Sequence, residues 1–114
     1  MNRDGARAED ACARLLEEAG LRVLSRNWRC RHGEIDLVAQ DRGTLVFAEV
    51  RLRRDGGRFG GAAESITAAK RARIVAAAGF YAARRPAMPC RFDVLLLDSL
   101  EPPRVEWIRD AFRP

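Results

Sequence analysis

The chain has 114 residues, 47% of them hydrophobic, with a net charge of +5 and a pI near 10.0. This length predicts one domain with a single core. No apolar run approaches about 18 residues and no apolar stretch follows the N-terminus, which excludes a membrane-spanning helix and a signal peptide and predicts a cytoplasmic protein.

The positive charge favours an acidic polymer, such as nucleic acid, as partner. Lys70 is the only lysine among 21 basic residues. This preference for arginine over lysine has two alternative explanations: selection for bidentate phosphate contacts, or a GC-rich coding sequence. Cys12, Cys30 and Cys90 are odd in number and lack metal-ligand spacing, so we expect reduced thiols. His32 is the only histidine, which excludes a His-based metal site or triad.

The first expected elements are a helix over residues 6–19, ended by Gly20, and a strand over residues 21–28. Apolar residues recur at helical spacing in this helix. Glu9 falls at the edge of the apolar stripe, and it is therefore the helix acid best placed to face a sheet.

Two apolar, β-branched runs follow, over residues 34–40 and 44–52, joined by a turn at residues 41–43, and they predict a β-hairpin. Alternation along a strand puts Glu34 and Asp36 on one face, with Ile35 and Leu37 on the other. Glu49 and Arg51 likewise share a face.

A hairpin that aligned these faces would gather three carboxylates and a guanidinium, Glu34, Asp36, Glu49 and Arg51, on a sheet built for burial. Such oxygen ligands suit Mg²⁺ beside phosphates, and the chemistry is metal-assisted phosphodiester hydrolysis. A structural ion-pair network is an equally open interpretation of the spacing.

Residues 53–62 are rich in glycine and arginine and predict a loop. Arg53, Arg54 and Arg58 are candidates for contacts to a phosphate backbone, with a solvated loop as the alternative. A second helix is expected over residues 64–85. Its wheel places Lys70 in the middle of the face that packs on the sheet, so its ammonium either extends to the surface or reaches the carboxylates.

The last elements are an apolar strand over residues 91–97, parallel to the third if the second helix is a right-handed crossover, and an edge strand over residues 105–108 after the break at Pro102-Pro103. The order αβββαβ(β) defines a single α/β domain, residues 1–114, with a mixed central sheet flanked by helices.

The chain resembles the bacterial YraN family along most of its length. The resemblance lies in five segments: Asn27-Trp28-Arg29, Gly33-Glu34-Ile35-Asp36, Val46-Phe47-Ala48-Glu49-Val50, Lys70 in the second helix, and Arg91-Phe92-Asp93-Val94. That family is similar in fold to the PD-(D/E)xK nucleases, notably the archaeal Holliday-junction resolvases. The resemblance therefore implies a restriction-endonuclease-like core.

Carried over residue by residue, the resemblance implies that Asp36 and Glu49 are metal ligands, that Glu9 is an auxiliary acid, and that position 51 is the motif's lysine. Glu34 matches the signature without an assigned role. The chain departs from the family at position 51, which is Arg, and at position 8, which is Ala where the family usually has Gly. Arginine stabilises charge but is no general base.

We therefore expect a nuclease acting on DNA, on branched or flapped structures, with Mg²⁺ or Mn²⁺ held by Asp36 and Glu49. The alternatives are a catalytically weak nucleic-acid-binding module and, third, a protein-interaction subunit with a structural acidic cluster. DNA versus RNA and junction versus flap stay open. A homodimer is expected only by analogy with resolvases, since two symmetric cuts need two sites.

Overall fold

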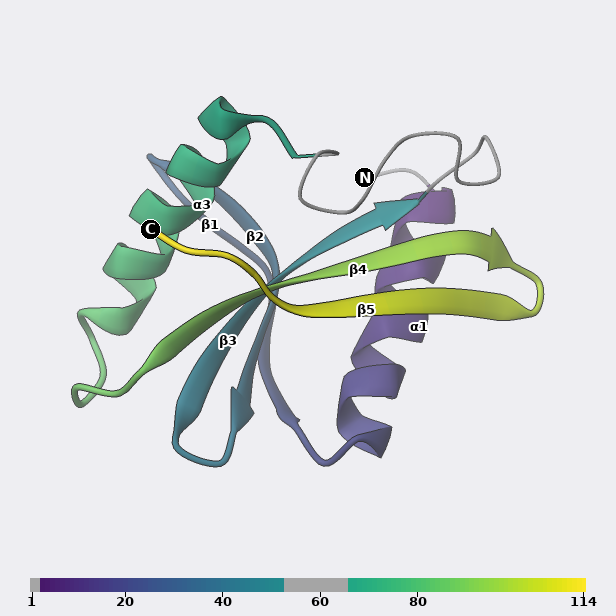
Figure 1. Cartoon of the computed structure of the whole chain (residues 1–114), viewed down its shortest axis with the longest axis horizontal. Helices are drawn as coiled ribbons and strands as arrows, with labels where there is room; N and C mark the ends of the chain where they lie inside the picture. The colour runs from purple at the N-terminus through teal and green to yellow at the C-terminus, as the bar shows by residue number, and fades with distance from the viewer. Residues whose placement is uncertain (1–2, 53–65) are drawn as a thin grey trace.

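The computed structural model describes residues 3–52 and 66–114, which form one α/β domain (Figure 1). The predicted order is confirmed, with the last strand fully formed. The elements are α1 (Arg3–Glu18), β1 (Arg22–Cys30), β2 (Gly33–Asp41), β3 (Thr44–Leu52), α3 (Ala68–Ala82), β4 (Cys90–Leu100) and β5 (Pro103–Phe112). Among these residues, no helix is long and apolar enough to cross a membrane.

The five strands form one mixed sheet in the order β1-β2-β3-β4-β5. β1, β2 and β3 are antiparallel, β4 is parallel to β3, and β5 is antiparallel to β4. The two parallel strands, β3 and β4, are connected by the chain segment that contains α3, as the sequence predicted. β1 and β5 are the two edges of this sheet.

The helices lie on opposite faces of the sheet, so the central strands are covered on both sides. The α1 face includes Cys12, Leu16, Leu37, Val46 and Leu95. The α3 face includes Ile35, Phe47, Ile74, Val94 and Phe112. Burial on both faces explains why β3 and β4 read as nearly continuous apolar runs. The three cysteines are free thiols, as predicted.

Several element boundaries differ from the predicted ones. The second helix begins at Ala68 and not at residue 64, because the Thr67 side chain accepts a hydrogen bond from the Lys70 amide at 3.1 Å and caps it. It ends at Ala82, before residue 85. The edge strand is longer than 105–108, since Pro103 opens it, and a proline is tolerated at the first position of an edge strand. Gly20, with φ of 94°, follows the end of α1 as predicted.

The expected alternation along β2 is wrong at one point. Ile35 packs in the α3 layer and Leu37 in the α1 layer, although they are two residues apart. Opposite them on β1, Asn27 has a φ of 52°, and the register passes from Arg26↔Leu37 to Trp28↔Ile35. The backbone therefore turns over at Asp36.

Beside this point, β2 and β3 separate and form a fork. Their pairing runs from Asp41↔Thr44 to Leu37↔Ala48 and no further, while β3 continues along β4 to Leu52↔Leu97. Figure 1 shows the two strands diverging above their crossing point. Asp36 and Glu49 are the first residues beyond the last pair, one on each strand.

A buried ion pair attaches β5 to β4. Asp93, which is 0% exposed, accepts two hydrogen bonds from the Arg91 guanidinium, at 2.9 and 3.0 Å. Trp107 Nε1 donates to it at 2.9 Å and the Asp110 amide at 3.0 Å. Every donor comes from β4 or β5, so this carboxylate fixes the register of the edge strand.

Asp93→Asn should lower the free energy of unfolding by about 3 to 5 kcal/mol, because it removes the fully buried charge on which Arg91, Trp107 and the Asp110 amide converge and leaves Asp41, at 3.2 Å, as the remaining partner of Arg91. The matched control is Asp98→Asn, since Asp98 pairs with Arg104 at 3.0 Å at the surface, and its loss should cost at most about 1 kcal/mol. Urea unfolding measures both. Equal effects of the two changes would contradict the structural role of Asp93.

Candidate functional site

A pair of carboxyl groups, Asp36 and Glu49, occupies the base of the fork. The two side chains are hydrogen-bonded to each other, and the Val50 amide donates to Asp36 Oδ2 at 2.9 Å. Glu49 is 5% exposed. Protonation of one of the two acids favours their contact, because two adjacent negative charges repel each other in a poorly solvated place.

Two cations approach Glu49 from different elements. Lys70 Nζ, from α3, lies 3.4 Å from Glu49 Oε2, and Arg51 Nη1, from the same strand, lies 3.8 Å from the same oxygen. Lys70 thus reaches the carboxylates, which decides between the two predicted positions of its ammonium. The sequence predicts that Asp36, Glu49, Arg51 and Lys70 lie close together. The structure brings these four side chains together at the fork.

Burial dominates the electrostatics of the pair. It raises the pKa of Asp36, and burial together with the Asp36 charge raises the pKa of Glu49 to about 7. Lys70 and Arg51 act in the opposite direction on Glu49 but are outweighed. Near neutral pH the site is therefore only partly ionised, and a divalent cation would compete with a proton for the same oxygens.

Glu9 and Glu34 lie at the border of the pair. They line one hollow of about 460 Å³ together with Asp36, Gly5, Ala8, Arg29, Val50 and Leu52. Glu9 is 4% exposed, accepts from Asn27 Nδ2 at 2.9 Å, and has a raised pKa because of burial. Glu34 pairs with Arg29 at 3.5 Å. Each auxiliary acid thus has a partner of its own.

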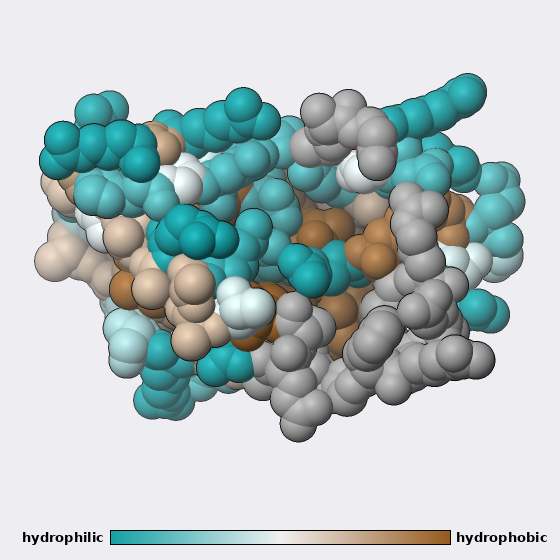
Figure 2. All heavy atoms as spheres, turned by 90° about the horizontal axis from the view of Figure 1, so that it is seen from above, coloured by the Kyte–Doolittle hydropathy of each residue, from teal (hydrophilic) through white to brown (hydrophobic). Residues whose placement is uncertain are grey.

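This hollow opens beside the fork. Figure 2 shows the molecule from above, with hydrophobic residues in its middle among hydrophilic side chains. Ala8 is 1% exposed in the wall of this hollow. Arg53, Arg54 and Arg58 lie outside the described residues.

Asn27 was not singled out from the sequence as a site residue. Besides its bond to Glu9, its buried Oδ1 has no hydrogen-bond partner among the described residues. Asparagine tolerates the left-handed backbone found at this position better than most residues. The usable sequence signal was a lone asparagine inside an otherwise apolar and basic strand.

The residues present suit Mg²⁺ or Mn²⁺ better than a cation that needs a full protein cage. Within 3–52 and 66–114, no group of three or more acidic, His or Cys side chains is arranged to hold a metal ion. Two adjacent carboxyl groups, Asp36 and Glu49, are what Mg²⁺ usually takes from a protein, the remaining positions going to water and phosphate. A divalent cation would replace the proton that this pair favours and compensate both carboxylates.

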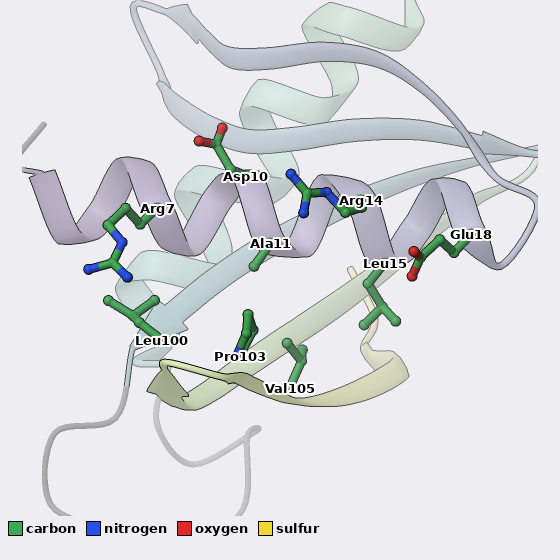
Figure 3. Close-up of a pocket in the computed structure, with 9 residues that line it drawn as sticks. All are labelled: Arg7, Asp10, Ala11, Arg14, Leu15, Glu18, Leu100, Pro103 and Val105. Atoms are coloured by element: carbon green, nitrogen blue, oxygen red, sulfur yellow. The ribbon is translucent and has the colours of Figure 1, made fainter.

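A second hollow, of about 430 Å³, lies between α1 and the β4–β5 end of the sheet (Figure 3). Arg7, Arg14, Asp10 and Glu18 border it, above the apolar side chains of Leu15 and Val105. It contains none of the predicted site residues, and its charges are mixed in sign. The acid pair at the fork is therefore the candidate functional site.

Comparison with known proteins identifies the family. Residues 8–97 match the family described as "Uncharacterised protein family UPF0102". The chain belongs to this family, which is the YraN family predicted from the sequence. The matched segment includes Glu9, Asp36, Glu49 and Lys70.

Its relatives cover nearly the whole chain. A UPF0102 protein of Ralstonia nicotianae is 53% identical over 113 residues, 95% of this chain and 85% of that protein. One from Methylobacillus flagellatus is 47% identical over 98% of both chains, and one from Dechloromonas aromatica is 53% identical over 95% of this chain and 87% of its own.

The pH dependence of stability tests the burial of Glu49. In the metal-free native state Glu49 keeps its proton up to about pH 7, whereas the unfolded chain releases it near 4.5. Between these values the native state binds more protons, so stability falls as pH rises. From pH 5 to 8 the wild type should lose about 1 to 3 kcal/mol more unfolding free energy than Glu49→Gln does.

The measurement is urea unfolding at both pH values in the presence of a chelator. Glu17→Gln, on the exposed face of α1, is the control and should keep the wild-type dependence. If Glu49→Gln keeps it as well, Glu49 is already ionised at pH 5 and belongs to a structural ion pair.

Proposed function

We propose that this protein is a metal-dependent nuclease that hydrolyses phosphodiester bonds in DNA, with flapped or branched structures as its substrates. The observation that carries the proposal is the hydrogen-bonded carboxyl pair, Asp36 and Glu49, at the fork, with the Lys70 ammonium 3.4 Å from Glu49 Oε2. Buried acids that are incompletely neutralised by their own protein are expected where a cation binds.

The two carboxylates hold Mg²⁺ or Mn²⁺ in this proposal. Such a cation polarises a phosphoryl oxygen and lowers the pKa of a bound water. Asp36 is held in orientation by the Val50 amide, and Glu49 by its bond to Asp36. Glu9, across the hollow on α1, is placed to hold water through its carboxylate, while Asn27 fixes its orientation.

Lys70 takes the role of the lysine that is absent from position 51. A lysine side chain can stabilise developing negative charge as an ammonium and can accept a proton as a neutral amine. An arginine side chain does only the first. Both cations lie within 4 Å of the same Glu49 oxygen. The helix therefore supplies an ammonium where the strand carries arginine, and Arg51 keeps the electrostatic part.

Nucleic acid is the proposed partner because the net charge is +5 and a phosphate backbone rewards basic proteins. A four-way junction would need two symmetric cuts, and for that substrate a homodimer is part of the proposal. The cytoplasmic location stays a prediction. The arginine at position 51, in place of the motif's lysine, favours a second candidate function: a nucleic-acid-binding module that keeps the fold but cleaves weakly.

A cleavage assay with Mg²⁺ or Mn²⁺ on flap and four-way-junction DNA separates these functions. Lys70→Met should lower the rate by about 10² to 10⁴, the contribution of a well-placed acid–base group. Lys70→Arg should keep only the electrostatic contribution of Lys70, so its rate should lie between those of Lys70→Met and the wild type. Arg51→Lys should change the rate little. Asp36→Asn should be inactive.

Arg104→Met is the control for the loss of one positive charge, since Arg104 pairs with Asp98 on the β4–β5 hairpin, and its rate should match the wild type. An increase on Arg51→Lys with no effect of Lys70→Met would place the catalytic cation on the strand. No cleavage by any variant, with salt-sensitive binding retained, would leave the binding module.

A further inference from the structure

Positive charge is concentrated on the α3 side of the molecule. No aspartate or glutamate occurs from residue 66 to residue 92, which includes all of α3, or from residue 19 to residue 33, which includes all of β1. α1, on the opposite face, carries acids along its length, among them Asp4, Asp10 and Glu17. A polyanion would therefore meet attraction on the α3 side and a mixed field on the α1 side.

Several arginines on this side have no acidic partner among residues 3–52 and 66–114. Within the described part of the chain, Arg31, Arg73, Arg84 and Arg85 form no ion pair. Arg73 and Phe80 are exposed and lie on one side of α3, seven residues apart, and the exposed Arg84 follows in the turn after the helix. Arg73 and Phe80 are thus on the helix that carries Lys70.

Phe80 stands out because it is 43% exposed, the large hydrophobic side chain that the described structure leaves most open to solvent. The His32 ring lies beside it, with centroids 4.5 Å apart and an angle of 35° between the planes, and Arg31 Cζ lies 5.8 Å from its centroid. Both neighbours come from the β1–β2 turn. An open aromatic ring with a second ring and a guanidinium beside it suits a flat, electron-rich partner.

The turn is held against the helix by a close backbone approach. A Cβ at Gly33 would lie 3.4 Å from Arg73 Cβ, and Gly33 has a φ of 155°. Figure 1 shows the β1–β2 tip beside α3. His32 and Arg31 are thus fixed next to Phe80, and we name Arg31, His32, Arg73, Phe80 and Arg84 the α3 platform.

A hollow of about 350 Å³ continues the α3 platform at the end of the helix. Trp28, Tyr81, Arg84, Arg85 and Pro86 line it. Trp28 and Tyr81 meet edge to face at 5.3 Å, and Arg85 Cζ lies 5.4 Å from the Tyr81 centroid. The pattern of ring and guanidinium therefore repeats at the next residue of the helix, Tyr81.

The distance to the proposed catalytic pair suits one nucleic-acid strand. Phe80 follows Lys70 by ten residues, or about 15 Å along the helix at 1.5 Å per residue. A strand that keeps the spacing of about 3.4 Å per nucleotide found along one strand of B-form DNA covers this in four or five steps, and a more extended single strand covers it in fewer. A strand running along α3 would thus contact the α3 platform and the carboxyl pair together.

We propose that the α3 platform binds a single-stranded stretch of nucleic acid, with a base stacked on Phe80 and phosphates paired with Arg73 and Arg84. Bases in a duplex are already stacked and leave no face for Phe80, so a duplex would use the arginines alone. This proposal rests on the proposed nuclease function and deepens it, because it makes an unpaired arm the feature that selects flapped or branched substrates.

The test is fluorescence anisotropy with labelled oligo(dT) and with a duplex of equal length, in chelator and in the Asp36→Asn background, so that binding is read without cleavage. Phe80→Ala should weaken oligo(dT) binding about 5- to 100-fold, the range for one stacked base, and leave the duplex unchanged. Phe80→Trp should restore the affinity. Arg73→Gln with Arg84→Gln should weaken both ligands and lower the oligo(dT) salt slope by about 1.4.

Arg104→Gln with Arg113→Gln removes the same net charge on the β5 side and should leave the salt slope as it is. Unchanged oligo(dT) affinity in Phe80→Ala overturns the proposal and assigns the exposed ring to a protein partner, and equal weakening for duplex overturns the selection of single strands. If Phe80→Ala loses oligo(dT) binding while the protein with Asp36 intact cleaves no DNA, the α3 platform is retained and the proposed nuclease function is rejected.

Discussion

The hydrogen bond between the carboxyl groups of Asp36 and Glu49 is the interaction on which the functional account depends. It forms because β2 and β3 stop pairing at Leu37↔Ala48 and leave one acid on each strand at the opening. α1 and α3 cover the two faces of the sheet, so water is largely excluded from Glu49 and its pKa is raised to about 7. The fold thus places a weakly ionised acid pair where a cation or a proton can be exchanged.

Glu49 differs from the other buried acid of the sheet in how it is compensated. Asp93 receives hydrogen bonds from the Arg91 guanidinium, the Trp107 indole and the Asp110 amide, and a buried charge satisfied in this way stabilises a register. Glu49 has two cations at 3.4 and 3.8 Å and another acid as its hydrogen-bond partner. The contrast between full and partial compensation separates a structural carboxylate from one that can bind a ligand.

Much of this was predictable from the sequence, because the hydrophobic period of each segment decides its type and the alternation in β3 puts Glu49 and Arg51 on one side. The position of Lys70 also followed from its helical wheel, although only the structure shows that its ammonium reaches Glu49. The fork did not follow, since the local sequence pattern does not show that β2 leaves β3 beyond Leu37↔Ala48 or that Ile35 and Leu37 pack in different layers. The exposed Phe80 was missed because its partners, His32 and Arg31, are distant in sequence.

Calorimetric titration with Mn²⁺ near pH 7, in buffers of different ionisation enthalpy, tests the central claim most directly. The account predicts one bound ion in the wild type with release of a proton, and no binding in Asp36→Asn or Glu49→Gln, both of which stay folded. Lys70→Met should bind Mn²⁺ at least as tightly, because it removes a competing positive charge from Glu49. Unchanged affinity in Asp36→Asn, together with clear destabilisation of both acid variants, would show that the pair is structural and contradict the account.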